Sequence, residues 1–289
     1  MRRFMLGLIG GLLVVAGGVW AAAPKVELKY QFRKGQTLRY RDWALIATLR
    51  VTPRGEDRVQ IKSESIYEQE VSKVEDSVFE LLTRTVSGRM TTIHNGDTKE
   101  EEVPSSRELV RLDARGQVLS RKDLEKEEGE ESDLTAPVDN PFEILQRVYD
   151  NLLFPAQPVE LGATWTDTAH IKLSAKHSVS VDIRSQLVRL VKVMGYDCAE
   201  IKTIFTVPLS EAPLEGKQVV PMTISGHLSG NLTLYFAYRE GYDVAHVGEI
   251  SYAMKMRAEP PPEAARLGAE PLEIATKMRV NLKTILQKE

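Results

Sequence analysis

The segment MTISGHLSGNLTLYFAY, residues Met222 to Tyr238, decides the fold. Large apolar side chains recur at every second position of this segment, with small or polar residues between most of them. A period of two is that of a β-strand with one buried face. Gly226 and Gly230 fall on the same face as the apolar residues, where glycine permits a sharp bend or the close approach of another element. The segment therefore predicts one long, bent strand.

The same alternation recurs on both sides of this strand. It is present at residues 26–32 and again at 272–286, and the Asn95-Gly96 pair is typical of a tight hairpin turn. Between Leu38 and Val51 the apolar residues change from even to odd positions, which we interpret as a β-bulge near Asp42. We therefore predict a mainly β protein: a strongly curved antiparallel sheet, or an open or half barrel, with one central amphipathic helix packed against it.

That helix is expected at residues 140–154. Asn140 is a typical N-cap, Pro141 suits the first turn, and Glu143 can reach back to the cap. Apolar residues then follow at helical spacing, which favours packing against the core. Residues 123–133, just before it, are strongly acidic and predict a solvated loop, since their spacing does not match a calcium-binding loop.

The chain after the first 21 residues is interpreted as a single β-rich domain, 22–289. Similar turn and strand patterns recur in its two halves, for example Gly35-Gln36-Thr37 and Gly162-Ala163-Thr164. One hypothesis is therefore two related meanders, 22–122 and 159–289, joined by the acidic loop and the helix. The alternative is that the two halves resemble each other by chance, because all half-buried strands share a period of two.

Residues 1–21 have the layout of a signal peptide. Two arginines precede an uncharged apolar stretch, and small residues follow, so cleavage is predicted after Ala21. The expected location is the periplasm or the exterior, with no stable membrane span after cleavage. An uncleaved anchor is the alternative, because about twenty uncharged residues can span a bilayer.

Composition argues against several function classes. The 289 residues carry 38 basic and 41 acidic side chains, which gives no general electrostatic reason to bind nucleic acid. Cys198 is the only cysteine, so no disulfide can form within the chain. The five histidines show no zinc-protease spacing, and no phosphate loop, dinucleotide fingerprint or nucleophile elbow occurs. We therefore predict no catalytic residues, no metal site and no cofactor.

Aromatic side chains are the candidates for lining a ligand pocket. Those we select are Trp43, Trp165, Phe236 and Tyr238. The alternative is core packing, because aromatic residues dominate cores and pockets alike.

Four stretches of the chain resemble a family of uncharacterised bacterial exported β-rich proteins. They are Leu28 to Gly35, Val159 to Trp165, Gly195 to Ile201 and Gly230 to Gly241. The resemblance covers most of the mature chain, and the four stretches are its motifs, which consist of turns and strand segments. The family supplies no established catalytic residues, so the resemblance implies fold and export rather than an activity.

The leading functional hypothesis is an exported, non-catalytic envelope protein. Its concave sheet would bind an apolar or amphipathic, lipid-like ligand or a partner protein of the envelope. The second hypothesis is a structural or assembly module that acts through an exposed sheet edge. A hydrolase is the third.

Overall fold

The computed structural model describes residues 25–125, 141–172, 178–213 and 222–288. Antiparallel strands dominate this part of the chain, as predicted. The elements are β1 (Thr37–Thr52), β2 (Gly55–Glu75), β3 (Val78–His94), β4 (Asp97–Glu102), β5 (Arg107–Asp113), β6 (Val118–Asp123), α1 (Pro141–Tyr149), β7 (Thr164–Lys172), β8 (Ser178–Val193), β9 (Tyr196–Pro213), β10 (Met222–Ala237), β11 (Tyr242–Ala258), α2 (Pro262–Arg266) and β12 (Leu272–Leu286).

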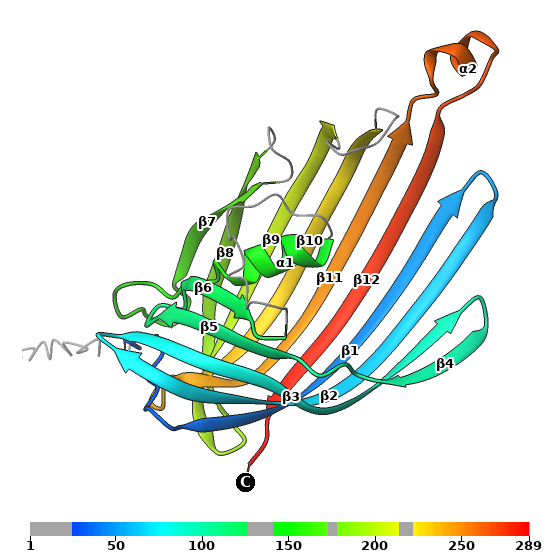
Figure 1. The fold of residues 1–289 in the computed structure, drawn as a ribbon. Coiled ribbons are helices and arrows are strands. Elements are labelled where there is room, and N and C mark those ends of the chain that lie inside the picture. The colour runs from blue at the N-terminus through cyan, green and yellow to red at the C-terminus, as the bar shows by residue number, and fades with distance from the viewer. Residues whose placement is uncertain (1–24, 126–140, 173–177, 214–221, 289) are drawn as a thin grey trace, which may run out of the picture.

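All twelve described strands form one sheet, in the order β6-β5-β3-β2-β1-β12-β11-β10-β9-β8-β7, with β4 paired to β3. The first and last strands lie side by side, because β1 pairs with β12. Among the described strands β6 and β7 do not pair, so the sheet is open there. Figure 1 shows the sheet curling, with α1 lying within the curl.

The hairpin predicted at Asn95-Gly96 is present between β3 and β4. Asn95 and Gly96 both have positive φ, and His94 pairs with Asp97 across this two-residue turn between β3 and β4. Backbone twist in such turns matches the twist of the strands they join. The predicted Asn-Gly hairpin is therefore confirmed.

The glycines of β10 act as expected. Gly226 has a φ of 146°, and the β9–β10 register shifts beside it. At Gly230, an added Cβ would lie 2.2 Å from the ring of Phe205 on β9. The missing side chain of Gly230 thus makes room for the Phe205 ring.

The N-terminal segment differs from the prediction. Val26, Leu28 and Phe32 are buried, so the alternation of burial is correct, but the segment forms only one isolated bridge, Val26 to Val159. Other backbone N–H groups of the segment donate to turn carbonyls, as Tyr30 does to Ala114 at 2.8 Å. An extended chain alternates its side chains with or without a ladder, which is why the pattern alone could not distinguish the two.

Helix α1 ends at Tyr149, short of the predicted end at 154. Beyond it, the Phe154 N–H donates to the carbonyl of Arg115 at 2.9 Å, so the chain leaves the helix to bind the turn between β5 and β6. Ile144 and Val148 are buried in the largest apolar cluster. Its other buried members are Ala169, Ile171, Val179, Val181, Ile183, Phe205, Val207, Leu209, Leu228, Leu232, Ile250, Tyr252 and Val280.

Some predictions lie outside the described residues. These are the signal peptide at 1–21, Asn140 at the predicted start of the helix, and most of the acidic loop, 126–133. The relation between the two meanders stays a prediction. Within the described part of the chain, neither helix is long and apolar enough to cross a membrane.

Candidate functional site

The two faces of the sheet differ in what covers them. Residues paired across an antiparallel ladder point to the same side, so register assigns each side chain to a face. Ile46 of β1 and its partner Val280 of β12 pack in the same cluster as α1, and we call this side the helix face. Trp43 and its partner Lys283 point to the opposite side, which we call the open face.

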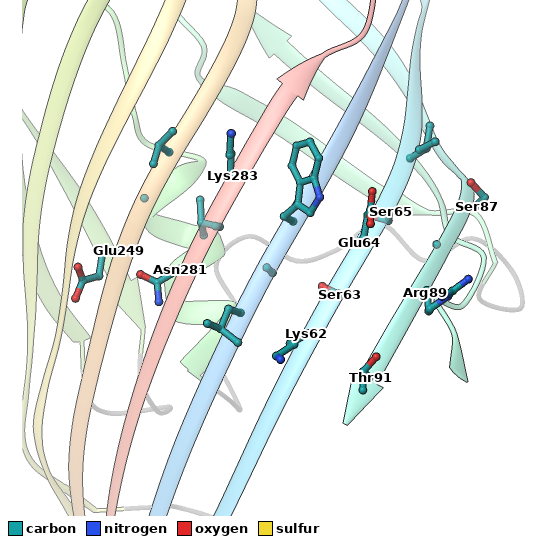
Figure 2. A pocket seen from close by; sticks show the side chains of 18 of the residues that line it. Lys62, Ser63, Glu64, Ser65, Ser87, Arg89, Thr91, Glu249, Asn281 and Lys283 are labelled. Atoms are coloured by element: carbon teal, nitrogen blue, oxygen red, sulfur yellow. The ribbon is translucent and has the colours of Figure 1, made fainter. Parts of the chain in front are cut away.

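The open face carries a hollow of about 1380 Å³. Most of its lining residues belong to the open face of β10, β11, β12, β1, β2 and β3. Figure 2 shows polar side chains from several of these strands around it, including Glu249 from β11, Asn281 and Lys283 from β12, and Arg89 from β3. The hollow is therefore built by the breadth of the sheet rather than by one loop.

A second hollow of about 1010 Å³ lies farther along the same strands. Ala47 and Leu49 line it from β1, with Ile93 from β3 and Ala253 from β11. Because Trp43 and Leu45 line the first hollow, the open face of β1 forms an apolar stripe beneath both. We call the two hollows together the groove.

The apolar stripe explains the change of phase in the sequence. The pairing of β1 with both neighbours runs without a register shift past Asp42, so the predicted bulge in this strand is wrong. Leu38 and Tyr40 are buried on the helix face, while Leu45 and Leu49 point to the open face. The strand is apolar on both sides. The prediction of a bulge assumed that only one side is apolar.

Lysines flank the stripe on both sides. The Lys283 ammonium lies 5.5 Å from the Trp43 ring, and Lys62 and Lys277 pair in register with Leu45 and Leu49. Within the described part of the chain, no carboxylate lies within 4 Å of these three ammonium groups, whereas the Arg279 guanidinium contacts Glu249 at 3.2 Å. The groove thus combines an apolar floor with three lysines that have no carboxylate within 4 Å among the described residues. Its lining also carries acidic side chains, which are those of Glu56, Glu64, Glu100, Glu101, Glu102 and Glu249.

The sequence-selected aromatic residues do not come together. Trp43 lies in the groove, and Trp165 lines a smaller hollow of about 120 Å³ on the helix face. Phe236 is fully buried against Tyr30 and Phe154, and Tyr238 packs at the edge of the same cluster. The structure therefore places one of the four in the groove.

A cluster of titratable side chains lies on the helix face. The Tyr30 hydroxyl lies 3.2 Å from both carboxylate oxygens of Asp243 and donates to them, and His246 Nε2 lies 3.1 Å from Asp243 Oδ2. Burial lowers the pKa of His246, but Asp243 and Asp42 outweigh it and raise that pKa above its ordinary value. Burial also raises the pKa of the Asp42 carboxyl.

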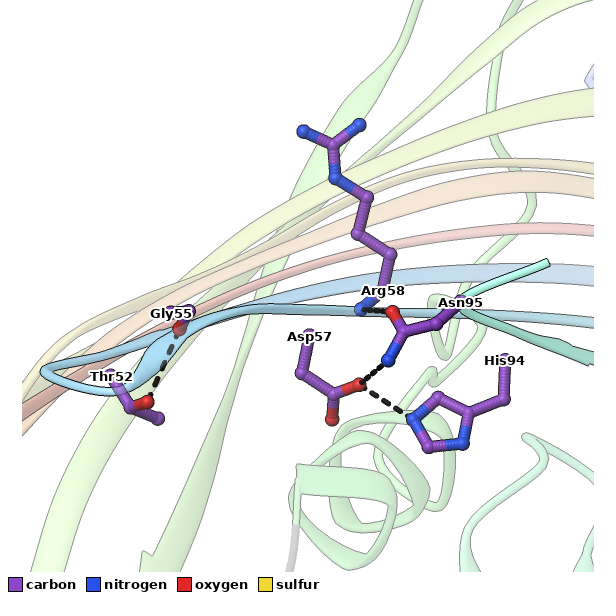
Figure 3. Close-up of polar contacts among 6 residues, drawn as sticks. All are labelled: Thr52, Gly55, Asp57, Arg58, His94 and Asn95. Carbon is purple, nitrogen blue, oxygen red and sulfur yellow. Dashed lines mark hydrogen bonds and ion pairs between the residues drawn. The ribbon is translucent and has the colours of Figure 1, made fainter.

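The remaining chemistry-bearing residues have structural surroundings. Cys198 is buried, and burial raises the pKa of its thiol to about 11, which suppresses the nucleophilic thiolate. His94 binds the Asp57 carboxylate, which also accepts from Asn95, and Figure 3 shows these contacts tying β3 to β2 at an exposed hairpin end. His94 holds the pKa of the Asp57 carboxyl below its usual range.

No group of three metal-ligating side chains gathers among the residues that the structure describes. Comparison with known proteins adds no homologue, because no family model and no curated protein matches the chain. Sequence reasoning missed Leu45, Leu49 and the flanking lysines. The change of apolar phase near Asp42 was the signal that could have found them.

Proposed function

We propose that the protein is exported to the periplasm or the exterior and binds an elongated amphipathic anion in the groove, without catalysing a reaction. In this proposal the sheet acts as an open half barrel, with α1 as an amphipathic helix on its inner side. The observation that carries the proposal is the apolar stripe of β1. None of the apolar clusters of the described residues includes Trp43, Leu45 or Leu49.

The dimensions of the stripe suit a single acyl chain. From Trp43 to Leu49 a strand rises about 20 Å, at roughly 3.3 Å per residue. One leaflet of a bilayer, half of a hydrocarbon core of about 30 Å, has a comparable length. Trp43, Leu45 and Leu49 are each partly exposed and lie outside the core clusters. A contiguous apolar surface of this kind is typical of a binding site.

Three lysines beside the stripe favour an anionic ligand, within a lining that also carries carboxylates. Lys62, Lys277 and Lys283 can lay their methylene stems along the stripe while their ammonium groups stay free. A carboxylate or phosphate group on the ligand would supply the partner that the described residues do not. Salt should weaken such exposed contacts.

Calorimetric titration with dodecanoate tests the proposal. We expect saturable binding, weaker binding of uncharged dodecanol, and loss of binding in Leu45→Glu, which places a carboxylate on the stripe. Ile204→Glu is the matched control, because Ile204 is 50% exposed on the open face of β9 and lies outside the groove. Equal loss in both variants, or no binding to the parent chain, would contradict the proposal.

An assembly role through a sheet edge is the second candidate. The observation that favours it is the lack of pairing between β6 and β7 among the described strands, because an unpaired edge can accept a strand from another chain. Light scattering over a range of concentrations tests it: a concentration-dependent mass supports assembly, and a monomer throughout excludes it.

A further inference from the structure

A smaller hollow lies on the helix face of the sheet, across from the groove, and Thr233, Val247 and Leu282 line both. It has a volume of about 120 Å³ and lies between the segment that follows α1 and the strands β7 to β12. Its walls are mostly apolar. The apolar side chains that line it include Phe154, Trp165, Ile201, Leu232, Leu234 and Leu282.

Several polar groups around the hollow already have partners. The hydroxyls of Ser185 and Thr203 lie 2.8 Å apart and bond to each other. Trp165 Nε1 donates to the carbonyl of Leu153 at 2.9 Å, and the Tyr30 hydroxyl donates to Asp243. These groups fix the walls and need nothing from a ligand.

Two side chains at the hollow retain hydrogen-bonding capacity. His246 uses Nε2 for Asp243, and no described residue bonds to its Nδ1, although 33% of the side chain is accessible. His246 is one of the residues that line the hollow. Tyr149 also lines the hollow, and no described residue accepts a hydrogen bond from its hydroxyl. Protonation of His246, which its two carboxylate neighbours favour, makes Nδ1 a donor like the Tyr149 hydroxyl.

Size and charge restrict what can enter. A cavity of about 150 Å³ lined by apolar side chains can hold benzene, whereas a drug-sized ligand needs about 300 Å³ or more. A long acyl chain therefore does not fit. The carboxyl groups of Asp42 and Asp243, which both act on His246, disfavour an anion. The apolar walls would leave most hydroxyls of a sugar without partners.

We propose that this hollow binds a small uncharged molecule, about the size of one six-membered ring, that carries a single acceptor oxygen such as a ketone. The apolar part contacts Leu232, Leu234 and Trp165, and the oxygen accepts from His246 Nδ1, with the Tyr149 hydroxyl as a second donor. The segment from Tyr149 to Phe154 covers the hollow, so local opening of this segment admits the ligand.

Calorimetric titration of the full chain with cyclohexanone tests this site, with benzoate and cyclohexane as comparison probes. Saturable binding of cyclohexanone, with benzoate at least tenfold weaker, supports the proposal. His246→Gln keeps an amide near the Nε2 position for Asp243 but removes Nδ1. We expect it to weaken cyclohexanone about fivefold, as expected for one hydrogen bond of about 1 kcal/mol, and to leave cyclohexane unchanged.

Two further variants locate the bound molecule. Leu234→Phe adds a ring where Leu234 lines the hollow and should abolish binding, with Ser185→Leu as a second filling variant if the first is poorly folded. Leu45→Glu on the open face should leave cyclohexanone binding unchanged. Absence of binding to the parent chain, benzoate binding as tightly as cyclohexanone, or loss of binding in Leu45→Glu but not in the filling variants would overturn the proposal. Failure of dodecanoate to bind the groove would leave these results unaffected.

Discussion

Leu45 and Ile46 are neighbours in β1 with opposite surroundings. Ile46 points to the helix face and packs against the cluster that contains α1. Leu45 points to the open face and lines the groove without joining any apolar cluster of the described residues. Two aliphatic side chains one residue apart therefore serve stability in one case and, in our proposal, binding in the other.

The difference teaches that apolar content and burial are separate properties of a strand. A half-buried strand needs only one apolar face, so a second one requires another explanation. On the helix face, covering elements exclude water and leave a hollow of about 120 Å³. On the open face there are hollows of about 1380 and 1010 Å³, and no element of the described chain covers them.

The largest effect should come from Phe236→Ala on the helix face. Phe236 is 0% exposed and packs against the rings of Tyr30 and Phe154. We expect the free energy of unfolding to fall by about 3–5 kcal/mol, as for other buried aromatic truncations. Urea unfolding measures this loss. Leu45→Ala is the counterpart on the open face, and its loss of unfolding free energy should be below about 1 kcal/mol. Equal losses of unfolding free energy in the two variants would contradict the proposed difference between the two faces.

Gly230→Ala should have the next largest effect. Its Cβ would meet the Phe205 ring at 2.2 Å, so the core must shift at a cost of about 1–3 kcal/mol. His227→Ala, an exposed open-face change in the same strand, is the control. In a cycle with Phe205→Leu, the two core changes should cost less together than their sum, because the smaller side chain relieves the clash. Strict additivity would contradict the assigned contact.

A smaller effect is expected from pH through His246. Its pKa is raised in the folded state, so the folded protein binds the proton more tightly than the unfolded chain. The stabilisation is fully present below the unfolded value of about 6.5 and is lost as pH rises through the folded value. Unfolding free energies measured from pH 6 to pH 9 should therefore fall more steeply for the parent chain than for His246→Gln. Parallel curves would exclude this contribution.

The smallest stability effect belongs to Leu49→Glu. Leu49 lies on the open face and outside the apolar clusters, so the free energy of unfolding should change by less than about 0.5 kcal/mol. Dodecanoate binding should nevertheless be lost, because the new carboxylate lies on the stripe. A destabilised variant would show instead that Leu49 helps to hold the fold.

Local patterns predicted the fold well where local chemistry decides it. The Asn95-Gly96 turn and the alternation of β10 depend on backbone preference and on period two, both of which are visible in the sequence. The single bridge at Val26 was not visible, because its partner Val159 is distant in the chain and extended chains alternate without pairing. The shortened helix has a similar cause, since Phe154 bonds to the distant Arg115.

The candidate site was harder to predict because it depends on register. Trp43 and Trp165 are both aromatic residues in strands, and only the pairing of twelve strands places them on opposite faces. Lys62 and Lys277 read as ordinary solvated charges until register sets them beside Leu45 and Leu49. Composition could indicate neither the faces of the two tryptophans nor the pairing of the lysines with the leucines.

Fluorescence quenching of Trp43 by a chain-brominated fatty acid tests the central claim most directly. Two chains are compared, both with Trp20→Phe: one retains only Trp43 through Trp165→Phe, and the other retains only Trp165 through Trp43→Phe. A ligand in the groove should quench Trp43 in a saturable, salt-sensitive manner and leave Trp165 unaffected. Quenching of Trp165 alone, or of neither residue, would contradict binding on the open face.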